Sequence, residues 1–330
     1  MYSTRLSAFS RSCTTLQRGF ATVAKDFRIP VIDFSKYRKA RTSAERKVTA
    51  DEVVAGFKES GFIYVDKHGI PPAIVRGAFQ KSAEFFALPP DTKDKLRWED
   101  PRSNRGYVTI GRERVTQSAD PNEIAALREK APDFKESMEI GRDWDATWKN
   151  QYRMEKLSCS SRLALIWMNG ILTTRLMTRI ITSGSCHTLL FSENYWRATG
   201  QARAGAHSDY GTLTLLFQDQ VGGLEVQDPH TGLYYPATPI PGTIVINVGD
   251  LLSRWSNDTL RSTLHRVVAP PAKQISETEV VTPARQSIAY FSNPNFTTEI
   301  SCLPNCGKEA KYPPVNTETY IVGRLAATYM

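Results

Sequence analysis

Hydrophobic and polar positions recur with two different periods in the first third of the chain. Alternating runs at Ile29–Phe34 and Phe62–Val65 predict short strands. Glu45–Ser60 and Ala73–Phe86 have the spacing of amphipathic helices, the first ending near Gly61. This part of the sequence therefore predicts a mixed region of helices and strands.

The pattern is weaker in the middle of the chain and becomes β-rich after about Ala204. Residues 108–141 predict only loops and short pieces, and residues 148–183 predict a helical stretch. Short β-rich runs separated by turn signals then follow at regular spacing, which indicates a sandwich or barrel. These runs are Thr212–Phe217, Leu224–Val226, Thr243–Val248, His265–Val268 and Ser287–Phe291, and Glu318–Tyr329 returns to helical spacing.

The first 25 residues have a composition of their own. They contain Arg5, Arg11, Arg18 and Lys25 and no acidic residue, so they carry half of the formal charge of +8. This Ser-, Thr- and Arg-rich segment has the composition of a mitochondrial presequence, and a disordered tail is the alternative. We expect the mature protein in the mitochondrial matrix, or otherwise in the cytoplasm.

Composition excludes several classes of protein. Charged residues interrupt every hydrophobic run, and beyond the leader no basic run alternates with aromatic residues, so we expect neither a membrane nor a nucleic acid as partner. Five scattered cysteines form no paired motif and indicate free thiols. The 330 residues divide into the leader (1–25), a mixed α/β region (26–145), an irregular helical segment (146–200) and a β domain with a C-terminal helix (201–330).

His207, Asp209 and His265 are the candidate metal ligands. His207 and Asp209 are separated by one residue, so on extended backbone their side chains point to the same face. His265 follows two or three strands later, close enough in a rolled sheet to join them. Two imidazoles and one carboxylate on one face of an octahedral ion leave three positions open, which is the ligand set of iron(II) oxygenases.

Arg285 and Ser287 form a second pair that faces one way. A guanidinium beside a hydroxyl is suited to binding a carboxylate, such as the distal carboxylate of 2-oxoglutarate. Taken alone, each of these short motifs is more often structural than functional. The occurrence of His207, Asp209, His265, Arg285 and Ser287 in this order within one β-rich region favours the functional interpretation.

Several longer motifs resemble those of the isopenicillin N synthase-like branch of the iron(II)/2-oxoglutarate-dependent dioxygenases. The resemblance covers most of the chain after the leader. It rests on Ile29–Phe34, Gly61–Tyr64, His68–Ile70, Phe85–Pro89, Arg105–Tyr107, Gly205–Gly211, Gly222–Val226, Pro241–Gly242, Ile246–Asp250, Leu264–Val267 and Arg285–Ser287.

This resemblance implies a fold and a ligand set. The fold is mainly β with α: a distorted double-stranded β-helix, or jelly roll, with flanking helices and a mixed N-terminal region. His207, Asp209 and His265 match the family's iron ligands, and Arg285 with Ser287 matches its 2-oxoglutarate anchor. Between residues 150 and 200 the chain departs from the family pattern, and Tyr195 is the remaining candidate contact to the co-substrate.

The implied reaction is oxidation of a small organic substrate, by hydroxylation, desaturation or ring closure, with release of succinate and carbon dioxide. Fe(II), 2-oxoglutarate and dioxygen take part, ascorbate is a candidate reductant, and secondary metabolism is the expected setting for a monomeric enzyme. Candidate substrate contacts are Arg105, Tyr107, Phe291 and Asn293. An iron oxidase that needs no 2-oxoglutarate and a non-catalytic binding protein are the alternatives.

Overall fold

The computed structural model describes most of the chain outside its N-terminal and middle segments. Its described residues are 27–97, 100, 103–112, 118, 121–130, 133–141, 150, 181–188, 191–192, 202–269, 273–274, 280–307 and 309–329. The predicted leader and Tyr195 lie outside these residues.

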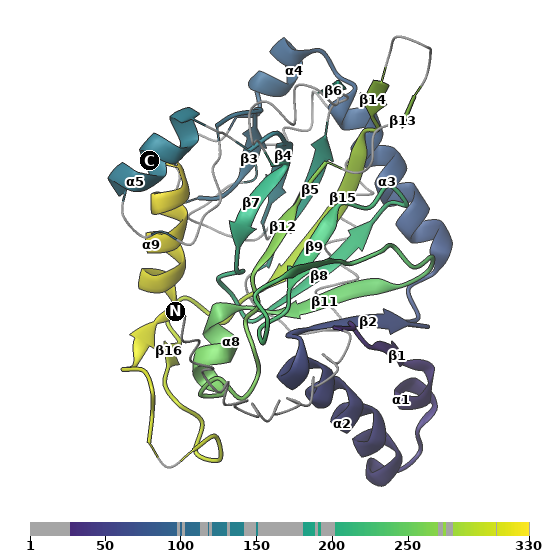
Figure 1. Cartoon of the computed structure of the whole chain (residues 1–330), viewed down its shortest axis with the longest axis vertical. Coiled ribbons are helices and arrows are strands. Elements are labelled where there is room, and N and C mark those ends of the chain that lie inside the picture. The colour runs from purple at the N-terminus through teal and green to yellow at the C-terminus, as the bar shows by residue number, and fades with distance from the viewer. Residues whose placement is uncertain are drawn as a thin grey trace, which may run out of the picture.

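Two antiparallel sheets form the centre of the molecule (Figure 1). The larger sheet has the strand order β1 (Val31–Asp33), β2 (Phe62–Asp66), β11 (Ile244–Val248), β8 (Leu213–Gln218), β15 (Arg285–Ser292), β5 (Ile181–Thr188), β4 (Glu136–Ile140) and β3 (Gly106–Val108). Among the described strands of this sheet, β1 and β2 pair in parallel and the other neighbours pair antiparallel. The smaller sheet has the order β10 (Tyr234–Pro236), β9 (Leu224–Gln227), β12 (His265–Val267) and β7 (Ala204–His207).

The two sheets pack face to face. Phe62, Tyr64 and Val245 of the larger sheet form one buried cluster with Leu224 and Val226 of the smaller sheet. Consecutive strands often lie in different sheets, as β8 and β9 do, which is the connectivity of a jelly roll. The predicted mainly β fold with flanking helices is confirmed.

Short ladders at the periphery join β13 (Lys273–Gln274), β14 (Val280–Thr282) and β6 (Phe191–Ser192), and join β16 (Glu299–Ile300) to β17 (Val315–Asn316).

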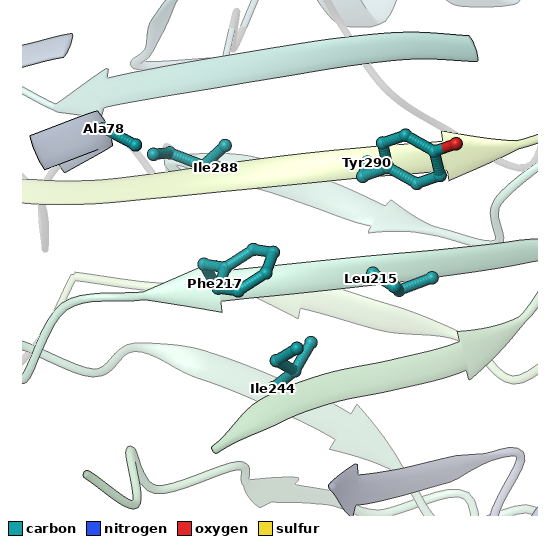
Figure 2. Close-up of a cluster of buried hydrophobic side chains, with 6 residues drawn as sticks. All are labelled: Ala78, Leu215, Phe217, Ile244, Ile288 and Tyr290. Carbon is teal, nitrogen blue, oxygen red and sulfur yellow. The ribbon is translucent and has the colours of Figure 1, made fainter. Parts of the chain in front are cut away.

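Helices flank the sheets, and α3 covers the outer face of the larger sheet. In Figure 2, Ala78 of α3 lies against Ile288 of β15. The same cluster contains Tyr290 of β15, Leu215 and Phe217 of β8, and Ile244 of β11. Complete burial of one such large apolar side chain stabilises the fold by about 1.5–3 kcal/mol. The described residues include the helices α1 (Ser35–Lys39), α2 (Ser43–Glu59), α3 (Pro72–Phe86), α4 (Pro90–Asp94), α5 (Pro121–Lys130), α8 (Asp250–Trp255) and α9 (Thr317–Tyr329). Within the described residues, no helix combines the length and the apolar character needed to span a bilayer.

Local sequence sets the ends of α2. The Thr42 hydroxyl accepts a hydrogen bond from the Glu45 backbone N–H at 3.2 Å, and the Glu45 carboxylate accepts one from the Thr42 N–H at 3.3 Å. This reciprocal pair satisfies N–H groups that have no partner within the helix. Gly61, at φ +73°, ends the helix in the left-handed conformation that glycine adopts without strain.

The middle of the chain differs from the sequence prediction. Residues 181–188 and 191–192 form strands β5 and β6, so the helical prediction for 146–200 is wrong for them. Helix α5 and strand β4 occupy a region for which only loops and short pieces were expected. Every residue of β4 is buried, so its sequence lacks the polar and apolar alternation of a half-exposed strand.

A buried ion pair joins the N-terminal helices to β4. Lys93 Nζ lies 2.7 Å from Glu136 Oε2, and their side chains are 8% and 2% exposed. Tyr107 also donates its hydroxyl to Glu136 Oε2, at 2.6 Å, and Lys93 donates to the Phe86 carbonyl oxygen. Removal of one partner from such a pair leaves a buried charge without compensation.

We predict that Lys93→Ala lowers the free energy of unfolding by about 3–5 kcal/mol, measured by urea denaturation. The control is Lys47→Ala, which removes the exposed pair with Asp51, whose side chains are 72% and 63% exposed. Such surface pairs contribute less than about 1 kcal/mol. Equal losses in the two variants would contradict the structural role of the Lys93–Glu136 pair.

Candidate metal centre

Direct pairing of β7 with β12 brings the candidate ligands together. His207 ends β7, His265 begins β12, and these two residues are register partners. Their ring centroids are 4.3 Å apart, and Asp209 follows β7 after one residue. The predicted convergence of the three side chains is therefore observed.

The distances and donor types fit a single metal ion. Asp209 Oδ1 lies 3.7 Å from His207 Nε2 and 3.6 Å from His265 Nε2. One ligand atom from each of the three residues lies within 4.8 Å of the others. Atoms that share an ion at about 2.1 Å lie no more than about 4.2 Å apart, so only small side-chain adjustments are needed to close the site.

Hydrogen bonds to backbone carbonyls fix the tautomer of both imidazoles. His207 Nδ1 lies 2.6 Å from the Gly205 carbonyl oxygen, and His265 Nδ1 lies 3.1 Å from that of Thr263. A carbonyl oxygen can only accept, so Nδ1 carries the proton and Nε2 presents its lone pair to the centre. Burial, with a contribution from the neighbouring His265, lowers the pKa of His207 to about 3 and keeps the imidazole neutral.

The Asp209 carboxylate is held by one of its two oxygens. Oδ2 accepts hydrogen bonds from Asn247 Nδ2, at 2.7 Å, and from the Thr214 hydroxyl. Burial opposes ionisation, but the two imidazoles and these hydrogen bonds hold the pKa of Asp209 below its usual range. Oδ1 thus faces the two Nε2 atoms as the oxygen of an ionised carboxylate.

This donor set suits iron(II). Two neutral imidazoles and one carboxylate leave three positions open on an octahedral ion, whereas a closed zinc site favours thiolates and tetrahedral geometry. His265 is 7% exposed and Asp209 is 8% exposed, so little water competes for the ligand atoms. His207, Asp209 and His265 could hold such an ion.

The predicted carboxylate anchor lies at the far end of the same sheet face. Arg285 and Ser287 are buried, and Arg285 Nη1 donates to Ser287 Oγ at 3.1 Å. Arg285 Nη2 donates to Gln218 Oε1 at 3.4 Å. Gln218 and Thr214 lie four residues apart on β8, so their backbones are separated by about 14 Å along the strand. Side chains that extend toward each other from the two ends make the distance between the functional groups shorter.

Phe291 and Asn293 lie at the metal end of this face. Phe291 is the register partner of Thr214, so their side chains share the face that holds Asp209. The Asn293 amide lies against Gly211, where any side chain would collide with Asn293 Oδ1. Both predicted substrate contacts are thus near the triad.

The other two predicted substrate contacts have different surroundings. Tyr107 occupies a register row with Met138 that continues through β5 to Ile288, whose side chain lies on the outer face. Its hydroxyl is bound to Glu136, and burial raises its pKa above the usual value. Tyr107 therefore packs with Phe85 and Phe86 of α3 on the outer face, away from the triad, and its assignment as a substrate contact stays a prediction. Arg105 is buried beside Gly141 and donates to Asn150 at 3.3 Å, so its substrate role stays a prediction.

Three further site residues escaped sequence reasoning: Thr214, Asn247 and Gln218. Asn247 is 3% exposed in the apolar run of β11, where a buried amide was a usable signal. Thr214 and Gln218 look like ordinary strand residues. Only the sheet order shows that they contact Asp209 and Arg285.

Two family descriptions match consecutive parts of the chain. Residues 29–158 match the family described as non-haem dioxygenase in morphine synthesis N-terminal, and residues 186–294 match the 2OG-Fe(II) oxygenase superfamily. The second match contains the triad and the Arg285–Ser287 pair.

Named relatives and solved structures agree with these matches. The chain is 30% identical to the 2-oxoglutarate-dependent dioxygenase frbA of Dothideomycetidae sp. (strain 11243), with 84% of the chain and 88% of the relative covered. It is 32% identical to the proline hydroxylase buaE of Petromyces alliaceus, with coverages of 83% and 92%. The crystal structure of a full-length Neurospora crassa protein with alpha-KG (2-oxoglutarate) and thymine is similar at a TM-score of 0.77 and 40% identity, covering 91% of this chain and 97% of that chain.

We predict that Asp209→Ala weakens Fe(II) binding by more than roughly 100-fold, because it removes a ligand atom. Loss of a residue that only hydrogen-bonds to a ligand typically weakens metal binding by roughly 10- to 100-fold. Anaerobic equilibrium dialysis measures the affinity. The control is Glu225→Ala on β9 of the same sheet, where the carboxylate pairs with Arg266. Wild-type affinity in Asp209→Ala would exclude Asp209 as a ligand.

Proposed function

Because the chain belongs to the 2OG-Fe(II) oxygenase superfamily and is a 2-oxoglutarate-dependent dioxygenase, we propose that it hydroxylates a small pyrimidine-type heterocycle, with thymine as first candidate. One atom of dioxygen would enter the product and the other would enter succinate, while 2-oxoglutarate loses carbon dioxide. A hydroxylation of this kind is balanced without a further reductant in each turnover.

The similarity to the Neurospora crassa protein is the observation that carries this proposal. Its identity of 40% over 91% of the chain exceeds the 30% and 32% of the two fungal relatives described above. The same protein was also solved with alpha-KG and 5-formyluracil, an oxidised relative of thymine. Thymine is therefore the substrate to test first.

The triad would hold the iron and leave room for two ligands beside it. Iron bound there supplies activation of dioxygen coupled to oxidative decarboxylation of 2-oxoglutarate. His207 and His265 would bind through Nε2, since both Nδ1 protons are donated to the backbone. Asp209 would bind through Oδ1, and Asn247 would keep the carboxylate plane in place.

Arg285 and Ser287 would bind the distal carboxylate of 2-oxoglutarate. The guanidinium is buried, and its contacts to Ser287 and Gln218 fix the direction of its donors. The triad and this pair lie toward opposite ends of one face of β8, so the two carboxylate ends of a bound 2-oxoglutarate would point to different ends of that face.

Phe291 and Asn293 would contact the substrate beside the triad. The Phe291 ring offers a flat apolar face on which a planar heterocycle can stack. The Asn293 amide has donors and an acceptor that match the alternating carbonyl and N–H groups of a pyrimidine dione. A planar, polar ring suits this pair of side chains better than an aliphatic chain does.

The two alternative functions are less well supported. Relatives named 2-oxoglutarate-dependent dioxygenases and neighbours solved with alpha-KG favour the 2-oxoglutarate-dependent reaction over an oxidase that does without it. The convergence of His207, Asp209 and His265 disfavours a non-catalytic scaffold. The mitochondrial location, the monomeric state and a role in secondary metabolism remain predictions from the sequence.

We predict that added thymine stimulates succinate release by the Fe(II)-loaded protein and yields a product with one additional oxygen atom. Mass spectrometry of both products measures the coupling. L-Proline is the comparison substrate, because one relative is named a proline hydroxylase. Succinate release that responds to L-proline and not to thymine would contradict the proposed substrate class.

We predict that Arg285→Ala raises the 2-oxoglutarate concentration for half-maximal turnover by at least tenfold, because truncating one member of a buried charge pair costs about 2–5 kcal/mol. Fe(II) affinity should change little. Arg266→Ala, which removes a guanidinium that is 39% exposed and paired with Glu225, serves as control. An unchanged 2-oxoglutarate requirement would rule out Arg285 as the anchor.

A further inference from the structure

Strand β7 carries a bulge immediately before His207. Its register partners in β12 are His207 with His265 and Ala204 with Val267. Two residues of β7, Gly205 and Ala206, therefore oppose the single residue Arg266. A bulge of this kind interrupts the ladder, leaves a backbone group without its strand partner and redirects the neighbouring side chain.

A carboxylate from another part of the chain accepts the N–H at this bulge. Asp133 Oδ1 accepts a hydrogen bond from the Gly205 N–H at 3.0 Å, across 72 residues of sequence. Gly205 is also the residue whose carbonyl oxygen lies 2.6 Å from His207 Nδ1. Asp133 and His207 thus bind the two backbone groups of one residue.

Asp133 lies in the interior of the protein. Its exposed fraction is 0%, and it lies in the segment between α5 and β4. Asp133 and Phe134 lie beside β7, the last strand of the smaller sheet, and the Phe134 N–H donates to the Ala202 carbonyl oxygen at 3.0 Å. A buried carboxylate of a distant segment is thus hydrogen-bonded to the backbone of β7 at its bulge.

We propose that Asp133 is a positioning residue for the metal centre: it holds the bulge of β7 in the conformation that aims the His207 imidazole at the metal position. Asp133 itself binds no metal in this arrangement. The inference rests on the proposed metal site and is independent of the identity of the substrate. It also gives the segment before β4 a role in assembling a centre whose ligands all come from the smaller sheet and its loops.

Anaerobic titration of the full-length protein with Co(II) tests this proposal, followed by the visible absorption of the bound ion, which reports coordination geometry. We expect Asp133→Ala to bind Co(II) roughly 10- to 100-fold more weakly than wild type, with an altered spectrum. Asp133→Asn keeps an acceptor oxygen near Gly205 and should recover most of the affinity.

The matched control is Asp228→Ala. Asp228 is 5% exposed and lies directly after β9 in the same sheet, and its carboxylate accepts hydrogen bonds from the His230 N–H at 2.9 Å and from the Thr231 hydroxyl at 2.7 Å. We expect this variant to lose thermal stability and to keep its Co(II) affinity. Comparison with Asp133→Ala therefore separates loss of stability from loss of positioning.

Two results would overturn the proposal: wild-type Co(II) affinity in Asp133→Ala, or an equal loss of affinity in Asp228→Ala. If Asp133→Ala shows no cooperative thermal transition, the milder truncation Asp133→Ser takes its place and is judged by the same two results. Failure of the wild-type protein to bind Co(II) would instead overturn the metal site and this inference together.

Discussion

The register between β7 and β12 is the constraint on which the metal centre depends. It sets His207 opposite His265, and the next turn of chain brings Asp209 to the same point. A shift of one residue would send one imidazole to the opposite face of the sheet. Both imidazoles must also present Nε2 to the metal position, and backbone carbonyls that accept from Nδ1 fix that tautomer in each ring.

The larger sheet connects the metal centre to the carboxylate anchor. Its inner face carries Thr214 beside the triad and Gln218 beside Arg285, so one strand relates the metal position to the carboxylate anchor. The outer face of the same strand packs on α3 through Leu215 and Phe217 (Figure 2). Rigid packing on the outer face therefore keeps the spacing of the functional groups on the inner face.

The N-terminal region completes the site from outside the jelly roll. Strand β4 extends the larger sheet, Lys93 neutralises the buried Glu136 on its outer face, and the residues just before it reach the edge of β7. These contacts connect residues 29–158, which match the N-terminal dioxygenase family, to residues 186–294, which match the 2OG-Fe(II) oxygenase superfamily. Buried polar contacts thus join the two regions in addition to the pairing of β2 with β11 and the apolar cluster around Phe62 and Tyr64.

The sequence by itself determined the features that depend on neighbours along the chain. The spacing of His207 and Asp209, the pairing of Arg285 with Ser287, and the ends of α2 all follow from strand alternation and helix capping, and the structure agrees. Tertiary structure alone decided the strand β5, the outward position of Tyr107, and the hydrogen bonds of Asn247 and Asp133. The physical reason is that alternation fixes which residues share a face but not which face is inside. A buried donor or acceptor finds its partner only when the order of strands in the sheet brings a distant segment beside it.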